Sequence, residues 1–182
     1  MDVDAEVLRA MAHPLRRRLL DVLRVDGPGT ASALAAATGS AVGNVSHHLK
    51  VLAGAGLVAE APELARDRRE RWWRLAVDRL QWSTTDFAED PAAAAAGVAA
   101  ESLGLARQIE LVRAWAQDPA AHTAPWGDAA FATDSWLRLT PEELSALSRE
   151  LLAVVDRWRE RPDDGQERRP VFLLARGFPA RP

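Results

Sequence analysis

Hydrophobic residues recur at helical spacing over residues 41–53. Val45, Leu49 and Leu52 lie at positions i, i+4 and i+7, so they form a stripe along one face of an α-helix. The remaining surface of this helix is small, polar or weakly charged, and it carries Gly43, Asn44, Ser46, His47 and Lys50. The pattern predicts an amphipathic helix that packs through one face and presents a polar face to solvent.

A shorter helix is predicted just before it, over residues 31–37. Thr30 can accept hydrogen bonds from the free N–H groups that open a helix, and Leu34 supplies a core contact. Gly39 stands where the chain leaves the helix, at a position that favours a positive φ. Two helices joined by a tight turn are therefore expected.

The pattern changes to alternation after the second helix. Residues 57–61 and 70–76 are predicted to be two strands of a hairpin, with Trp73 and Leu75 on one face of the second strand. The turn between them is rich in arginine, and the cluster comprises Arg66, Arg68, Arg69, Arg71 and Arg74. This order is typical of a winged helix-turn-helix, in which the second helix can lie in the DNA major groove and the basic hairpin can reach phosphates.

Three segments in this order resemble the ArsR/SmtB-type winged-helix repressors: LRAMAHPLRRRLLDVL, VSHHLKVLAGAGLV and RRERWWRL. The resemblance covers residues 5 to about 80. It implies that Asn44, Ser46, His47 and Lys50 face double-stranded DNA, and that residues 66–69, with Arg66, Arg68 and Arg69, form the tip of the wing. The arginine cluster adds Arg71 to the expected DNA contacts.

The sequence departs from the family at the start of the second helix. Ala41 stands where a capping serine is usual, so Ser40 is expected to cap the helix instead. Val42 and Gly43 stand where the family commonly has polar residues that read bases. No operator sequence can therefore be carried over from the family.

The net charge of −3 hides a difference between the two parts of the chain. Residues 1–82 carry 12 Lys and Arg against 10 Asp and Glu, whereas residues 83–182 carry 11 against 16. The part that resembles a DNA reader is therefore the basic one, with its positive charge concentrated at the wing. This distribution indicates a local phosphate-binding surface.

Metal chemistry is not indicated. The sequence has no cysteine, so it has no thiolate site and no disulfide. His47 and His48 are adjacent and point about 100° apart on a helix, which prevents joint chelation. We expect neither a metal nor a cofactor. The acidic start of the chain is unlike a secretory signal and no apolar run is long enough to cross a membrane, so we expect a cytoplasmic protein without a membrane partner.

The second part of the chain is predicted to be α-rich. One helix is expected over residues 92–117, with Val98, Leu105, Ile109 and Val112 along one face that needs a partner. A second helix begins at Thr140, where threonine, proline and glutamate give a strong start signal. Residues 135–139 and 171–175 are predicted strands that pair with each other. We assign residues 1–82 to the winged helix-turn-helix domain and residues 83–182 to an α-rich dimerisation and effector-binding region.

Four of the seven tryptophans lie in residues 83–182. Trp115, Trp136 and Trp158 can supply flat apolar walls for a small organic effector. The alternative is that these side chains fill a core in a chain that has no tyrosine.

The fold class is therefore mainly α with a small β component. We expect a homodimeric transcription regulator, a repressor, that binds an inverted-repeat operator, because one recognition helix reads only a few base pairs. No catalytic motif is visible in the sequence, so we do not expect an enzyme. Two alternatives stay open: a winged helix used for protein–protein contacts, and an unrecognised enzyme activity in residues 83–182.

Overall fold

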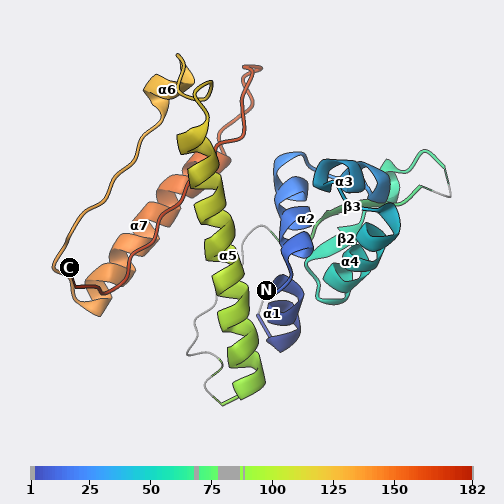
Figure 1. Cartoon of the computed structure of the whole chain (residues 1–182), viewed down its shortest axis with the longest axis horizontal. Coiled ribbons are helices and arrows are strands. Elements are labelled where there is room, and N and C mark those ends of the chain that lie inside the picture. The colour runs from blue at the N-terminus through green and yellow to red at the C-terminus, as the bar shows by residue number, and fades with distance from the viewer. Residues whose placement is uncertain (1–2, 68–69, 78–86, 88, 182) are drawn as a thin grey trace. The chain divides into compact units, whose positions relative to one another are not determined.

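The chain is mainly helical with one small sheet, as its sequence predicts (Figure 1). The structure is a computed structural model that describes residues 3–67, 70–77, 87 and 89–181. The chain divides into two compact units, Met1–Glu110 and Leu111–Pro182. In chain order the elements are α1 (Ala5–Met11), α2 (Pro14–Val25), β1 (Gly29–Thr30), α3 (Ala31–Thr38), α4 (Val42–Gly54), β2 (Val58–Glu60), the 3-10 helix η1 (Pro62–Leu64), β3 (Trp72–Leu75), α5 (Pro91–Gln117), α6 (Trp126–Ala129) and α7 (Pro141–Arg159).

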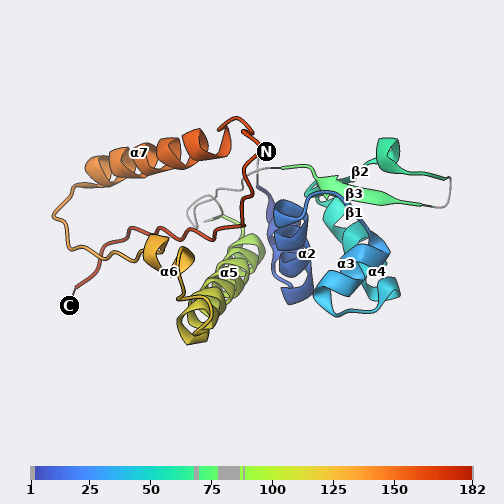
Figure 2. The ribbon, with the colours of Figure 1, turned by 90° about the horizontal axis from the view of Figure 1, so that it is seen from above.

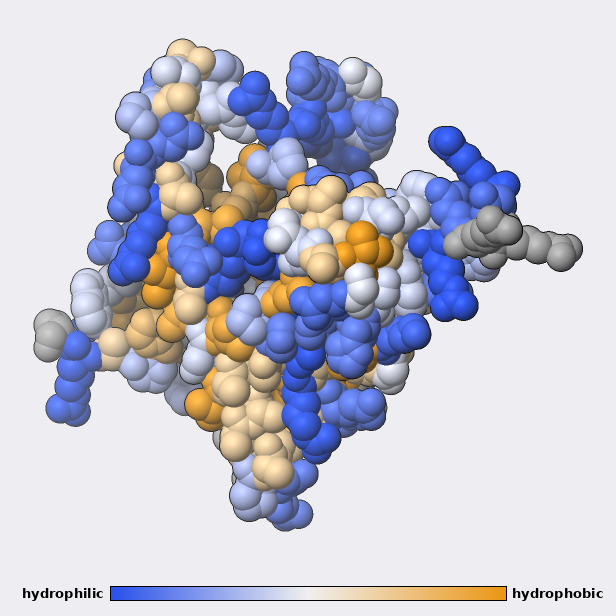
Figure 3. Space-filling model, turned by 45° about the vertical axis from the view of Figure 1, so that its right-hand side comes forward, coloured by the Kyte–Doolittle hydropathy of each residue, from blue (hydrophilic) through white to orange (hydrophobic). Residues whose placement is uncertain are grey.

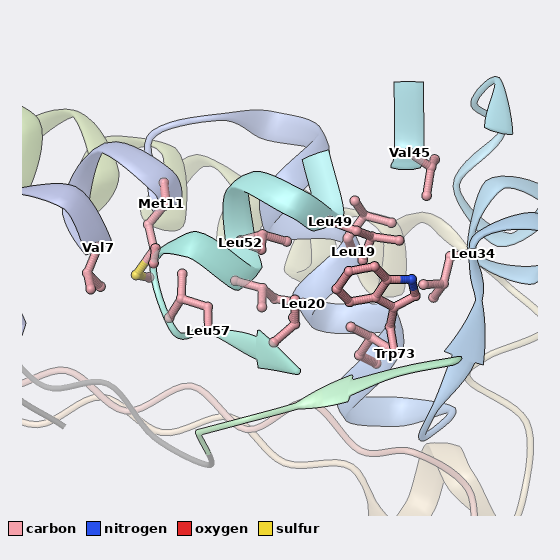
Figure 4. Close-up of a cluster of buried hydrophobic side chains, with 14 of the residues drawn as sticks. Val7, Met11, Leu19, Leu20, Leu34, Val45, Leu49, Leu52, Leu57 and Trp73 are labelled. Atoms are coloured by element: carbon pink, nitrogen blue, oxygen red, sulfur yellow. The ribbon is translucent and has the colours of Figure 1, made fainter. Parts of the chain in front are cut away.

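The core of the first unit lies where helices α2, α3 and α4 meet the sheet. Leu19, Leu34 and Leu49 come from the three different helices and are almost completely buried. The indole of Trp73 reaches up from β3 among these leucines (Figure 4). The apolar stripe predicted for residues 41–53 is confirmed, because Val45, Leu49 and Leu52 are all fully buried. This packing fixes which face of α4 is left outside.

The ends of α3 follow the sequence prediction. The side chain of Thr30 accepts a hydrogen bond from the Ala33 N–H at 3.2 Å, which caps the helix. Gly39 ends it in the left-handed conformation with φ 63°. The expected cap of α4 is wrong: its N-cap is Ala41, which makes no side-chain cap bond, and the Ser40 hydroxyl donates backwards to the Thr38 carbonyl. Ser40 lies one residue too early to reach the first turn of α4.

A three-stranded antiparallel sheet closes the unit, with the strand order β1-β3-β2. The two predicted strands are confirmed as β2 and β3, in which Glu60 pairs with Trp73. Sequence reasoning missed β1, which pairs Gly29 with Trp73 on the other side of β3. The β2–β3 hairpin projects beyond the helices α2, α3 and α4 and forms the wing (Figure 2).

Helix α5 joins the first unit through small residues. Ala93, Gly97, Ala100 and Gly104 are its buried positions, and Ala100 belongs to the core of the first unit. The guanidinium of Arg17 in α2 lies against Gly104, where an added Cβ would come within 2.6 Å of Nη2. Arg107 of α5 also approaches Asp21 of α2 at 3.6 Å. The large apolar residues of the predicted face, Val98, Leu105, Ile109 and Val112, are exposed.

The second unit contains the end of α5 together with α6 and α7. The start of α7 is as predicted: Thr140 and Glu143 form a capping box, with Pro141 at the first helical position. The short helix α6 was not predicted from the sequence. The two predicted strands are wrong, because residues 135–139 and 171–175 form no strand. Their side chains are exposed and no ladder supports them, and apolar, β-prone residues alone do not make a strand.

Candidate nucleic-acid interface

Helix α4 separates its apolar and polar residues cleanly. Asn44, His47 and Lys50 are exposed and Ser46 is half-buried, on the side away from the buried stripe. Gly43 is also exposed, so no bulky side chain covers the backbone of the first turn. The four predicted contacts therefore lie on one helix, and three of them are open to a ligand. Amide, imidazole and ammonium groups can hydrogen-bond to base edges or phosphates in a major groove.

The wing supplies charge, but part of that charge is already paired. Arg71 lies 3.6 Å from Glu60, and Arg74 lies 2.5 Å from Glu63. These exposed ion pairs cross the hairpin, and each contributes little to stability. Arg66 is exposed near the start of the turn, whereas Arg68 and Arg69 lie outside the described residues. The described surface at the outer end of the hairpin is hydrophilic (Figure 3).

A glutamate shapes the described end of this turn. The Glu70 carboxylate accepts a hydrogen bond from the Arg66 backbone N–H at 2.9 Å. This bond holds the pKa of Glu70 below its usual range. The Glu70 N–H in turn donates to the Asp67 carboxylate at 3.1 Å. Arg66 is therefore fixed at its backbone while its side chain extends into solvent.

A cluster formed by His13, Arg16 and His48 connects α4 to the residues that precede it in the chain. His48 is only 7% exposed, and its ring lies 4.3 Å from the ring of His13. Arg16 Nη1 lies 3.4 Å from His48 Nδ1, and Arg16 also donates to the carbonyls of Arg9 and Ala10. One guanidinium thus ties the end of α1 to α4. The sequence alone does not indicate this role of Arg16, because only the fold brings residues 16 and 48 together.

Both imidazoles of this cluster favour the neutral form. Burial lowers the pKa of His48, and the nearby His13 and Arg16 lower it further. Burial also lowers the pKa of His13, with a contribution from Arg16. Because both rings resist protonation, the cluster keeps α4 in place most firmly when the histidines are neutral.

The three tryptophans chosen as an effector site do not lie together. Trp115 lines a hollow of about 630 Å³ in the second unit, and the other indole in that hollow belongs to Trp126. Trp136 and Trp158 do not line it and are largely exposed. Sequence reasoning did not select Trp126, because only the fold brings residues 115 and 126 to the same hollow. Effector binding itself stays a prediction.

Comparison with protein families identifies a helix-turn-helix domain. The family model of a helix-turn-helix domain matches residues 11–61, which run from the end of α1 through β2. No curated protein matches the chain. Among the described residues no helix is long and apolar enough to cross a membrane, and no group of His, Cys, Asp and Glu has the arrangement of a metal site.

The match coincides with the geometry. It covers α3 and α4, the two helices that the buried leucines hold together, and it includes all the exposed polar residues of α4. Helix-turn-helix domains of this kind are DNA-binding regulatory domains rather than enzymes. The chain therefore contains a helix-turn-helix domain and is similar to DNA-binding transcription regulators.

Proposed function

We propose that this protein is a sequence-specific transcriptional repressor of the ArsR-like type that binds an inverted-repeat operator as a homodimer. Residues 1–82 are the DNA-binding domain in this proposal, and residues 83–182 serve dimerisation and effector binding. The observation that carries it is the division of α4, with three fully buried apolar residues on one side and exposed Asn44, His47 and Lys50 on the other. Because α4 is the second helix of the matched helix-turn-helix domain, this exposed face is the one that would enter a major groove.

The roles of the polar residues follow from their chemistry. The amide of Asn44 can pair with an adenine edge through two hydrogen bonds, and the exposed imidazole of His47 can donate to or accept from a base. Lys50, with Arg66, Arg68, Arg69 and Arg71 of the wing, serves phosphates. Ser46 is half-buried and suits a backbone phosphate better than a base edge. DNA binding by Arg71 requires that it leave or share its pairing with Glu60.

The exposed face of α5 supports the homodimer. Val98, Leu105, Ile109 and Val112 form one row on this helix, and all are at least 39% exposed. A row of large aliphatic side chains in water gains free energy when a second copy covers it. Two copies related by a two-fold axis present two α4 helices to two half-sites.

Selection of bound duplexes from a random pool tests this proposal. The full chain should enrich an inverted repeat whose half-sites lie about one helical turn, or a multiple of it, apart. His47→Ala and Asn44→Ala should each change the enriched bases, whereas Arg24→Ala, which removes a charge from the far end of α2, should enrich the wild-type site. Recovery of no sequence preference, or of the same site with all three variants, contradicts the assignment of α4.

The repressor role has its own measurement. Transcription from a promoter that carries the selected site should fall when the wild-type protein is added, because the bound dimer blocks polymerase. His47→Ala should leave transcription unchanged at the same concentration. A rise in transcription with the wild-type protein would identify an activator instead.

A further inference from the structure

A hollow in the second unit has walls that come from three short stretches of chain. These are the end of α5, residues 118–126 and residues 167–170. Its volume of about 630 Å³ lies within the range of sites that bind small organic molecules. Two tryptophans, two prolines and three charged residues give it its character: Trp115, Trp126, Pro125, Pro170 and the charged Asp118, Glu167 and Arg169.

The two indoles are held in different ways. The ring of His122 lies 5.1 Å from the ring of Trp115, and His122 Nε2 lies 3.0 Å from the Trp115 carbonyl oxygen. This contact braces Trp115 at the end of α5. Trp126 is the first residue of α6, and the guanidinium of Arg169 lies 5.7 Å from its ring centroid. The face of Trp126 therefore already accommodates a planar cation from the chain itself.

The carboxylates of the hollow are not equivalent. Asp118 accepts a hydrogen bond from the Ala120 N–H at 2.9 Å, which commits it to the turn after α5. Glu167 has no hydrogen bond or ion pair with any described residue. Arg169 supplies the only positive charge among the lining residues, and it is engaged with Trp126. The lining thus combines aromatic faces with one uncommitted negative charge and a net charge of −1.

We propose that this hollow binds a flat organic cation of drug-like size. The ring system of the ligand packs against Trp115 and Trp126, and its positive charge lies near Glu167. The ligand competes with Arg169 for the face of Trp126, so Arg169 turns outward on binding. The role of this ligand as an effector rests on the proposed function, whereas its binding does not.

Calorimetric titration of the DNA-free full chain with three quinoline probes tests the binding. The probes share a ring system and differ in charge: 1-methylquinolinium is a cation, quinoline is neutral near pH 7.5, and quinoline-2-carboxylate is an anion. We expect 1-methylquinolinium to bind most tightly. Equal affinities for the three probes, tighter binding of the anion, or no heat from the cation at millimolar concentration would each overturn the proposal.

Matched variants locate the site. Glu167→Gln should weaken 1-methylquinolinium by about two- to fivefold and leave quinoline unchanged. Trp126→Leu should weaken both by at least about threefold. The control for Glu167 is Glu150→Gln, which changes an exposed carboxylate outside the hollow. The control for Trp126 is Trp158→Leu. Trp158 is also exposed, and the guanidinium of Arg161 lies 4.9 Å from its ring centroid. A control that weakens the cation as much as its partner variant assigns the binding to nonspecific surface contact and refutes the site.

A separate assay decides the effector role. If 1-methylquinolinium binds as expected and also lowers the affinity for the selected duplex, the hollow regulates DNA binding. If it binds with the expected dependence on Glu167 and Trp126 but leaves DNA affinity unchanged, the site stands and its effector role is refuted. A chain that binds the probe but no duplex refutes the proposed function while the site stands.

Discussion

The two compact units differ in how deeply they bury tryptophan. In the first unit, Trp73 is 5% exposed and lies among leucines from α2, α3 and α4. In the second unit, Trp136 and Trp158 are 67% and 64% exposed, and none of its described residues is buried. Buried apolar area is the main source of folding free energy. The first unit therefore carries its own stability, whereas we expect the second to gain order from a ligand or a second chain.

The largest expected difference between the units comes from removing one leucine side chain in each. Leu49→Ala deletes a fully buried side chain and should destabilise the first unit by about 2–5 kcal/mol. Leu137→Ala changes a side chain that is 62% exposed and should cost less than about 1 kcal/mol. Urea unfolding followed by hydrogen exchange of each segment measures both. Similar losses at the two sites would remove the distinction between the units.

The proposed dimer surface gives the next largest expected effect. Ile109→Glu places a charge in the exposed aliphatic row of α5 and should weaken the homodimer by about 2 kcal/mol, or roughly thirtyfold in Kd. Ala114→Glu adds the same charge to an exposed position outside that row and should leave Kd within about twofold. Sedimentation at several concentrations measures the two constants. A wild-type chain that is monomeric at micromolar concentration, with and without DNA, would contradict the proposed homodimer.

Removing one helix cap in each unit should have a smaller effect on stability, and the effect should spread differently in the two units. Thr30→Ala and Thr140→Ala each remove a side-chain cap and should each cost about 1 kcal/mol. The loss at Thr30 should lower the stability of the whole first unit, because α3 is part of its core. The loss at Thr140 should speed hydrogen exchange in α7 alone. Faster exchange throughout the second unit in Thr140→Ala would indicate a cooperative core there.

The smallest effect is a dependence on pH confined to the first unit. His13 and His48 have pKa values below the ordinary 6.5 in the folded chain, so the unfolded chain binds more protons. The stability that these rings supply is present above pH 6.5 and is lost as the pH falls below it. The urea midpoint of the first unit should fall between pH 7.5 and 5.5. The urea midpoint of the doubly substituted chain, with His13→Gln and His48→Gln, should fall less over the same pH range. A fall equal to that of the wild-type chain would show that these two histidines are not the source of the pH dependence.

The sequence predicted the helix-turn-helix well because several local signals agree there. The apolar stripe of α4, the cap at Thr30 and the left-handed Gly39 all specify the same structure. The exposed side chains of Asn44, His47 and Lys50 then follow from helix geometry. The support from Arg16 could not be predicted, because it depends on tertiary contact between α2 and α4.

The sequence predicted less where partners decide the structure. The strand β1 is two residues long and has no alternation to detect, yet β3 completes it. Residues 171–175 have the composition of a strand, but no ladder forms there. The buried face of α5 was missed because alanine and glycine contribute little to a hydrophobic stripe, although their small size lets α5 approach Arg17 closely.

The central claim is that the exposed face of α4 reads DNA sequence. The most direct test is the affinity of the full chain for its selected duplex and for a scrambled duplex of equal length, at two salt concentrations. Asn44→Ala should lose about 1–3 kcal/mol on the selected duplex alone. Arg66→Ala should weaken both duplexes alike and reduce the salt dependence. A wild-type chain that binds both duplexes equally, or an Asn44→Ala variant with undiminished discrimination, would contradict the claim.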